Sequence, residues 1–190
     1  MSVRKLIPEK NGVFFITFTC FKWLKLYQYT NSYAAVYKWF DVLKTKGHHI
    51  VAYVIMPSHL HVIIAFKNSN TPINTIIGNG KRFLAYELVS YLEKKGLQDI
   101  LFEMQKNISK NDKKKYKKHE VFQPSFDWKE CYNIHILKQK ADYIHFNPCK
   151  AGLSFCPEKY LHSSAKYYYT GEQGIYPVIT YMELQDVDLS

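Results

Sequence analysis

The stretch "HIVAYVIMPSHLHVIIAF", residues 49–66, predicts the centre of the fold. Its two apolar runs, 49–56 and 59–66, are rich in the β-branched and aromatic residues that are typical of strands. Pro57 and Ser58 lie between the runs and are common turn residues. We therefore expect two antiparallel strands joined in a β-hairpin.

The segments on either side of this hairpin complete a known pattern. Residues 13–21 and 121–128 are expected to be strands, and residues 31–47 and 71–96 are expected to be helices that each end at a glycine. The order strand, helix, strand, strand, helix, strand predicts an α+β protein of the ferredoxin-like or RRM-like class. Its four-stranded antiparallel sheet would carry two helices on one face, with a further C-terminal helix added to this core.

The chain is strongly basic. It contains 26 Lys and Arg residues against 16 Asp and Glu residues, which gives a formal net charge of +10. Only Arg4 and Arg82 are arginines, and seven of the lysines lie within 106–118. Lysine acts on phosphate as a point charge, so a nucleic acid would suit this surface. A lysine-rich surface that only keeps the protein in solution explains the charge equally well.

Composition also limits the cellular setting. The four cysteines form no C-x-x-C pair, and no apolar run reaches the roughly 20 residues that a membrane helix needs. Residues 1–12 are polar and contain Pro and Gly, unlike a signal peptide. We therefore expect reduced thiols and a cytoplasmic protein without a membrane partner.

The second half of the hairpin contains two histidines within an apolar run. Because side chains alternate along a strand, His59 and His61 point to the same face, with Cα atoms about 7 Å apart. Both rings can then reach one metal ion while Leu60 points into the core. Taken alone, such a pair is more often two ordinary histidines on a half-exposed face, and two ligands do not complete a metal site.

Residues 133–146 predict the added helix, which is expected to stop at Asn147 because Pro148 follows. Tyr143 and Asn147 are four residues apart and share one face of this helix with Gln139. The opposite face is apolar and is expected to pack against the rest of the protein; its members are Ile134, Leu137, Ala141 and Ile144. Tyr143 alone could equally be a packing residue.

Two motifs together make the sequence recognisable. "MPSHLHVII" (56–64) and "ADYIHFNPCKAGL" (141–153) resemble the single-tyrosine HUH transposases and look closest to the REP-associated tyrosine transposases. The His-hydrophobic-His motif is matched by residues 59–61, and the Y-I-x-x-N-P motif by residues 143–148. "FQPSFDW" before the added helix and "YLHSSAKYY" after it also match, so the resemblance spans nearly the whole chain.

The resemblance implies a metal-dependent single-stranded DNA endonuclease and strand transferase, a transposase that recognises DNA hairpins. Tyr143 would be the nucleophile that becomes covalently joined to a 5′ phosphate. His59, His61 and Asn147 would bind a divalent metal ion, Mg²⁺ or Mn²⁺. We also expect a nucleoid-associated protein of the bacterial type, with a homodimer as one possible state.

The same resemblance divides the chain into a catalytic domain, residues 1–154, and a C-terminal tail, residues 155–190. Basic residues elsewhere are candidates for contact with DNA phosphates. They are Lys81, Arg82, Lys113, Lys114 and Lys115. The first two follow Gly78 and Gly80, which permit close approach of a backbone, although a kinked helix with two surface charges is an equal alternative.

A second function remains open at this point. The sheet of an RRM-like protein binds nucleic acid through exposed aromatic side chains, and "FFITF" (14–18) offers such residues. In that case Tyr143 would be structural, and the protein would bind nucleic acid without cutting it. A structural zinc protein is disfavoured, because the sequence lacks four closely spaced Cys or His residues.

Overall fold

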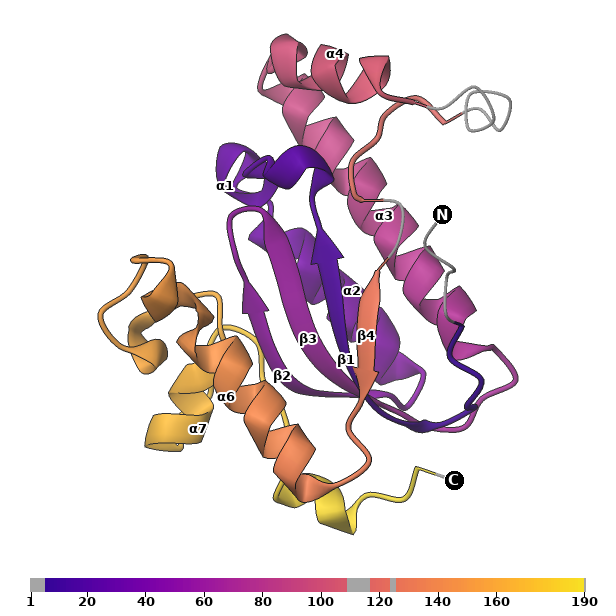
Figure 1. The fold of residues 1–190 in the computed structure, drawn as a ribbon, viewed down its shortest axis with the longest axis vertical. Helices are drawn as coiled ribbons and strands as arrows, with labels where there is room; N and C mark the ends of the chain where they lie inside the picture. Colours follow the sequence, from indigo (N-terminus) through magenta and orange to yellow (C-terminus); the bar gives the residue numbers. More distant parts are fainter. Residues whose placement is uncertain (1–5, 109–116, 124–125, 190) are drawn as a thin grey trace.

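A four-stranded antiparallel sheet with the order β2-β3-β1-β4 forms the centre of the molecule (Figure 1). The computed structural model describes residues 6–108, 117–123 and 126–189. The strands are β1 (Gly12–Thr19), β2 (His49–Ile55), β3 (His59–Phe66) and β4 (Asp127–Glu130). The predicted hairpin is confirmed, and the N–H of Met56 closes its turn on the carbonyl of His59 at 2.8 Å.

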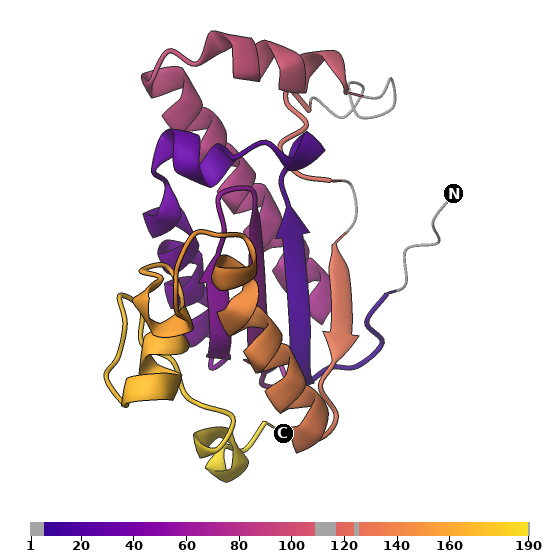
Figure 2. The same cartoon turned by 60° about the vertical axis from the view of Figure 1, so that its left-hand side comes forward.

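Two long helices, α2 (Tyr33–Thr45) and α3 (Ile73–Lys94), cover one face of the sheet (Figures 1 and 2). They pack closely because Gly80 of α3 faces Trp39 of α2, and a Cβ at Gly80 would overlap the indole. The predicted fold class is therefore confirmed. Among the described residues before β4, the short helices η1 (Phe21–Trp23), α1 (Leu26–Thr30) and α4 (Gln98–Lys106) lie outside this layer. They were not expected from the sequence.

The added helix α6 (Ile134–Lys150) lies across the opposite face of the sheet (Figure 2). The prediction that it stops at Asn147 is wrong, because the helix continues through Pro148. The proline lies in the last turn, where it removes only one N–H donor. Its carbonyl accepts from the N–H of Leu153 at 2.8 Å, and that of Asn147 accepts from Ala151 at 3.0 Å. Ile134, expected to be buried, is 48% exposed.

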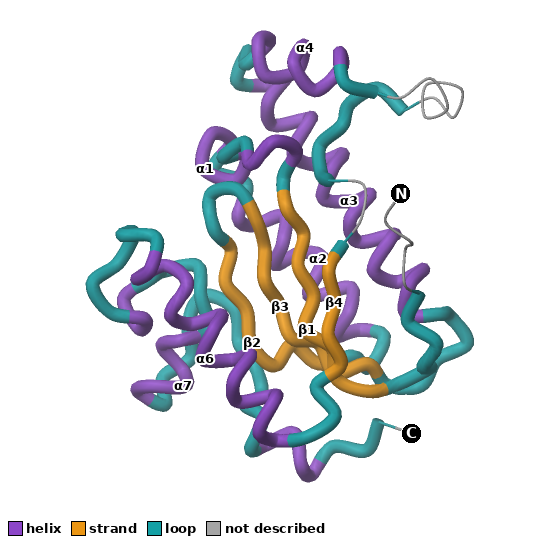
Figure 3. The backbone as a smooth tube through the Cα atoms, viewed as in Figure 1, coloured by secondary structure: helices purple, strands orange, loops and turns teal. Residues whose placement is uncertain are grey.

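The fourth strand begins later than predicted. Phe122 forms only an isolated bridge with Cys20, while continuous pairing with β1 begins where Asp127 lies opposite Thr17. Phe122 is buried in the core, and its neighbours still bond to the end of β1: the N–H of Gln123 donates to the carbonyl of Thr19 at 2.9 Å. Figure 3 shows β4 as a short edge strand beside β1.

Both faces of the sheet are covered, which explains why β3 is apolar almost throughout. Leu60, Val62 and Ile64 point toward α2 and α3. The alternate residues Ile63 and Ala65 lie in a second core beneath α6. His59 and His61 belong to this second face by the strand alternation. The site is therefore set between the sheet and α6.

The C-terminal tail follows the free edge of β2. It contains η2 (Pro157–Lys159), α7 (Ala165–Thr170) and η3 (Glu183–Asp186). The N–H of Ile55 donates to the carbonyl of His162 at 2.9 Å, and the N–H of Ser164 donates to that of Tyr53 at 3.0 Å. In the described ranges, no helix has the length and apolar character needed to cross a membrane.

Candidate active site

Strand β3 brings the two predicted histidines together on the face that α6 covers. The ring centroids of His59 and His61 are 4.7 Å apart, at an interplanar angle of 72°. His61 is buried, and His59 is half-buried. The prediction that both rings share a face is confirmed. Their separation is small enough for the two rings to share one ligand between them.

Hydrogen bonds orient both rings through the same nitrogen. The Nδ1 atom of His61 lies 2.8 Å from Oγ1 of Thr17, which is its partner across the β1–β3 ladder. The Nδ1 atom of His59 lies 3.1 Å from Oγ of Ser58. With Nδ1 engaged, Nε2 is the nitrogen that each ring can offer to a metal ion.

Burial keeps His61 neutral. It lowers the pKa of His61 to about 3, and the nearby His59 and Lys140 add to this effect. Burial also lowers the pKa of His59, and this effect is opposed by the Asn147 side chain, whose amide oxygen accepts from the ring and so raises the pKa. A neutral imidazole is the form that binds a metal ion, so both rings are in the state that ligation requires.

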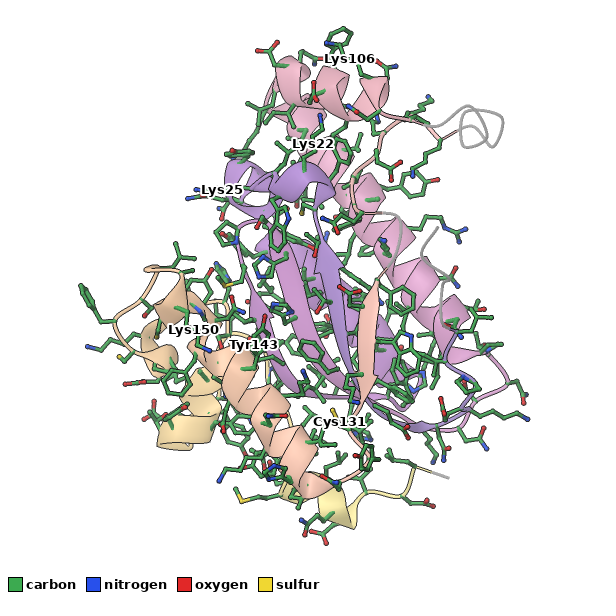
Figure 4. The ribbon with its side chains drawn as sticks, in the orientation of Figure 1. Lys22, Lys25, Lys106, Cys131, Tyr143 and Lys150 are labelled. Atoms are coloured by element: carbon green, nitrogen blue, oxygen red, sulfur yellow. The ribbon has the colours of Figure 1, made fainter. Side chains whose placement is uncertain are left out.

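Helix α6 places Tyr143 next to this pair. Figure 4 shows Tyr143 on α6, beside the sheet. The Tyr143 ring centroid is 5.2 Å from that of His61 and 5.9 Å from that of Phe15, both in edge-on contacts. Tyr143 remains 40% exposed. The phenol is thus held against His61 on one side and accessible from solution on the other.

Asn147 also lies near the pair, close enough to His59 for its side chain to raise the pKa of that ring. Its amide oxygen is therefore a third candidate metal ligand beside the two imidazoles. Among the residues that the structure describes, no group of three His, Cys, Asp or Glu side chains is arranged to hold a metal ion. The available set of two nitrogens and one amide oxygen fits a divalent ion that keeps water or phosphate oxygens as its other ligands. Gln139, predicted on the same helix face, is exposed.

Two lysines that the sequence analysis missed lie on either side of Tyr143. The Nζ atoms of Lys140 and Lys150 are each 5.8 Å from the Tyr143 ring centroid, and Lys140 is also 4.9 Å from that of Phe15. Their spacing from Tyr143, three residues before and seven after, is the signal that could have identified them, because such residues share one face of a helix.

An exposed tryptophan lies at the other end of the site. Trp23 is 59% exposed, and its ring centroid is 5.3 Å from that of His59. Lys22 and Trp23 have φ values of 48° and 59°, a left-handed conformation that is uncommon for residues other than glycine. Such outliers are concentrated at functional sites. No local pattern in the sequence indicated this residue, because it meets His59 only through the fold.

Two of the predicted DNA contacts lie away from this site. Lys81 and Arg82 are on α3, across the sheet from the histidines, and line a groove of about 710 Å³. Lys81 donates to the carbonyl of Gln123, and Arg82 donates to Oδ1 of Asn79 at 3.2 Å. Gly80 serves the packing of α3 on α2 rather than an approach by DNA. Lys113, Lys114 and Lys115 lie outside the described residues.

This arrangement defines a class: a ferredoxin-like sheet with a histidine pair on one face and a tyrosine-bearing helix laid over it. Among solved structures, the chain is similar to a REP-associated tyrosine transposase bound to a REP hairpin. The TM-score is 0.63 at 19% identity, over 100% of this chain and 97% of that one. The chain therefore has the fold of a REP-associated tyrosine transposase, and the predicted resemblance is confirmed in its fold.

A second similarity is weaker. A candidate transposase from Deinococcus radiodurans has a TM-score of 0.43 at 12% identity, over 75% of this chain and 95% of that one, which is too low to establish a common fold. No protein-family model and no curated protein match the chain.

Proposed function

We propose that this protein is a transposase that cuts and rejoins single-stranded DNA through Tyr143 and recognises DNA hairpins. The observation that carries the proposal is the contact between the Tyr143 and His61 rings, 5.2 Å apart at their centroids, beside the His59–Asn147 pair. The fold supports it, because the similar REP-associated tyrosine transposase was solved with a REP hairpin.

The proposed reaction is a transesterification. The phenol oxygen of Tyr143 loses its proton to solvent and attacks a backbone phosphorus. A new bond forms between the tyrosine oxygen and phosphorus, and the bond from phosphorus to the 3′ oxygen breaks. The departing 3′ oxygen takes up a proton and becomes a free hydroxyl, while the 5′ phosphate stays on Tyr143. One phosphodiester replaces another, so a later 3′ hydroxyl can reverse the attack and join strands.

The residues around Tyr143 have distinct parts in this proposal. His59, His61 and Asn147 would hold Mg²⁺ or Mn²⁺. A bound divalent ion supplies Lewis-acid stabilisation of the charge that develops on the transferring phosphate. Lys140 and Lys150 lie beside the nucleophile, where their positive charge would attract the same phosphate and help to align it with the phenol.

The DNA strand would enter along Trp23, whose exposed ring stands beside His59. An exposed aromatic ring next to positive charge is the usual platform for unpaired bases. The basic groove beside α3, with Lys81 and Arg82, would contact DNA backbone away from the cut.

The burial of the sheet aromatics argues against a non-catalytic RRM-like function. Binding by such a sheet needs aromatic side chains exposed on its open face. Phe14 and Phe18 of β1 are fully buried toward α2 and α3. Phe15 is buried beneath α6, in contact with His61 and Tyr143. These aromatics therefore pack the two cores and are not available to bases.

The test is a covalent-adduct assay. The protein is incubated with labelled single-stranded DNA that carries the hairpins flanking its own gene, with Mn²⁺ or with EDTA, and is run on a denaturing gel. Wild type should form a metal-dependent adduct that Tyr143→Phe and His61→Ala both abolish. Tyr132→Phe, an exposed tyrosine just before α6, is the matched control and should retain it. DNA binding without any adduct in wild type would refute the proposal.

A further inference from the structure

A buried hydrogen-bonded junction, separate from the histidine pair, ties α6 to the rest of the protein. His145 follows Tyr143 by two residues and so points to the other side of the helix. Its Nε2 atom lies 2.9 Å from Oγ of Ser164. Both side chains are 1% exposed.

Ser164 joins this contact to strand β2. Its Oγ accepts from the N–H of Tyr53 at 2.9 Å, and its own N–H donates to the carbonyl of Tyr53 at 3.0 Å. The His145 ring also packs against Tyr168 of α7, with centroids 4.6 Å apart. One serine of the C-terminal tail thus connects the helix that carries Tyr143 to the backbone of the sheet.

The junction lies level with His61 in the sheet. Val54, next to Tyr53, is paired with His61 of β3 on one side and with Ser163 of the tail on the other. The junction therefore attaches α6 next to the row of paired residues that contains His61. A shift of the helix along this row would change the distance between Tyr143 and His61 directly.

Apolar contacts alone would hold α6 in its position on the sheet less tightly. The buried residues Leu137, Ala141 and Ile144 hold α6 on the sheet, but such contacts are non-directional and tolerate small rotations and shifts. The His145–Ser164 bond is directional, and breaking it leaves buried polar atoms without partners. It therefore selects one position of the helix.

We propose that His145 and Ser164 are positioning residues for the Tyr143 nucleophile, and that the C-terminal tail is in this way part of the catalytic unit. The proposal rests on the function proposed above. It adds that residues that touch neither DNA nor a metal ion set the rate of cleavage by holding α6 in place. Misplacement of a reacting group by about 1 Å can slow a reaction about 100-fold.

The test compares two neighbouring serines. Ser164→Ala removes the link between His145 and Tyr53, because the lost Oγ contacts both residues. Ser163→Ala is the matched control, because Ser163 is equally buried and its Oγ bonds the backbone of Tyr53 and Ala165 instead of His145. Ser164→Ala should slow single-turnover cleavage by about 10- to 100-fold, with the DNA Kd changed less than about twofold. Ser163→Ala should slow it less than about threefold.

A second pair of variants protects the test against simple misfolding. His145→Gln keeps a polar group near the position of Nε2 and should retain most of the cleavage rate, whereas His145→Leu should lose it. Equal losses in Ser163→Ala and Ser164→Ala, or in the Gln and Leu variants, would show a general loss of stability and overturn the proposal.

Hydrogen exchange of the DNA-free, metal-free protein separates this inference from the proposed function. Amides of residues 141–147 should exchange faster in Ser164→Ala than in wild type or Ser163→Ala. If wild type forms no adduct, the proposed function fails, and this comparison still decides whether the junction holds α6. Unchanged exchange in Ser164→Ala would overturn the inference by itself.

Discussion

The Thr17 hydroxyl lies 2.8 Å from Nδ1 of His61, and the two residues are directly opposite each other in the β1–β3 ladder. The contact fixes the rotation of a buried ring whose other nitrogen faces the site. Partners of this kind orient metal-binding histidines, and their loss typically lowers metal affinity or activity by about 10- to 100-fold. The orientation of His61 is thus set by a residue more than forty positions earlier in the chain.

Thr17→Val should therefore weaken Mn²⁺ binding and slow cleavage by about 10- to 100-fold, because valine keeps the shape of threonine without its hydroxyl. Titration calorimetry and single-turnover cleavage would measure the two effects. Thr19→Val is the control, since Thr19 is equally buried on the same strand face. An equal loss of Mn²⁺ affinity and cleavage rate in both variants would mean that the Thr17 hydroxyl does not orient His61.

Lys140→Met should slow cleavage and reduce the salt dependence of DNA binding, because one ammonium group near the phosphate is lost. For single strands, each lost phosphate contact lowers the slope of log K against log salt concentration by about 0.7. Fluorescence anisotropy at several salt concentrations would measure this slope. Lys138→Met, an exposed lysine on the same helix, is the control. The same slope in wild type and Lys140→Met would place Lys140 away from DNA.

Trp23→Ala should weaken the binding of single-stranded DNA by about 1–3 kcal/mol, which is the usual effect of losing one base-stacking side chain. Trp23→Phe keeps an aromatic ring and should retain most of the affinity. Tyr132→Ala removes another exposed aromatic residue, outside the site, and should bind as wild type does. If Trp23→Phe binds single-stranded DNA as weakly as Trp23→Ala, the loss of base stacking does not explain the lower affinity.

Two glycines of α3 should respond to alanine in opposite ways. Gly80→Ala should destabilise the fold by about 1–3 kcal/mol, because its Cβ would overlap the Trp39 indole. Gly78→Ala meets nothing within 4 Å and should stabilise the helix by up to about 1 kcal/mol. Chemical unfolding would measure both free energies. A stable Gly80→Ala protein would contradict the close packing of α3 on α2.

Acid should destabilise the protein partly through His48. This ring is buried beside Phe66, and its Nδ1 accepts from the N–H of Lys67 at 3.2 Å. Burial lowers the pKa of His48 below 6.5, with help from Lys46 and His49. The unfolded chain therefore binds the proton more readily than the folded protein. Stability is complete above pH 6.5 and falls as the pH drops from there toward the lowered pKa.

His48→Asn keeps an acceptor for Lys67 without a titrating ring. As the pH falls, the free energy of unfolding of this variant should decrease less steeply than that of wild type. The two slopes should differ by up to about 1.4 kcal/mol per pH unit. Unfolding curves between pH 4 and 7 would measure the difference, with the exposed His135→Asn as control. Parallel curves for wild type and His48→Asn would refute the assignment.

The sequence was sufficient for features that depend on local patterns. Alternation along residues 59–66 determined that His59 and His61 share a face, because the side-chain period of a strand is two. Helical spacing placed Tyr143 and Asn147 on one side of α6. Turn and glycine signals located the hairpin and the ends of α2 and α3 within a few residues.

The tertiary structure decided what depends on contacts between distant segments. Only the fold brings Trp23 against His59 and Ser164 against His145, since no local period relates residues so far apart. Packing also overrode local rules: Pro148 stays in α6 because its ring is buried in the last turn. Sequence alone therefore determined which groups could do the chemistry, whereas their distances and orientations were decided by burial and by hydrogen bonds between elements.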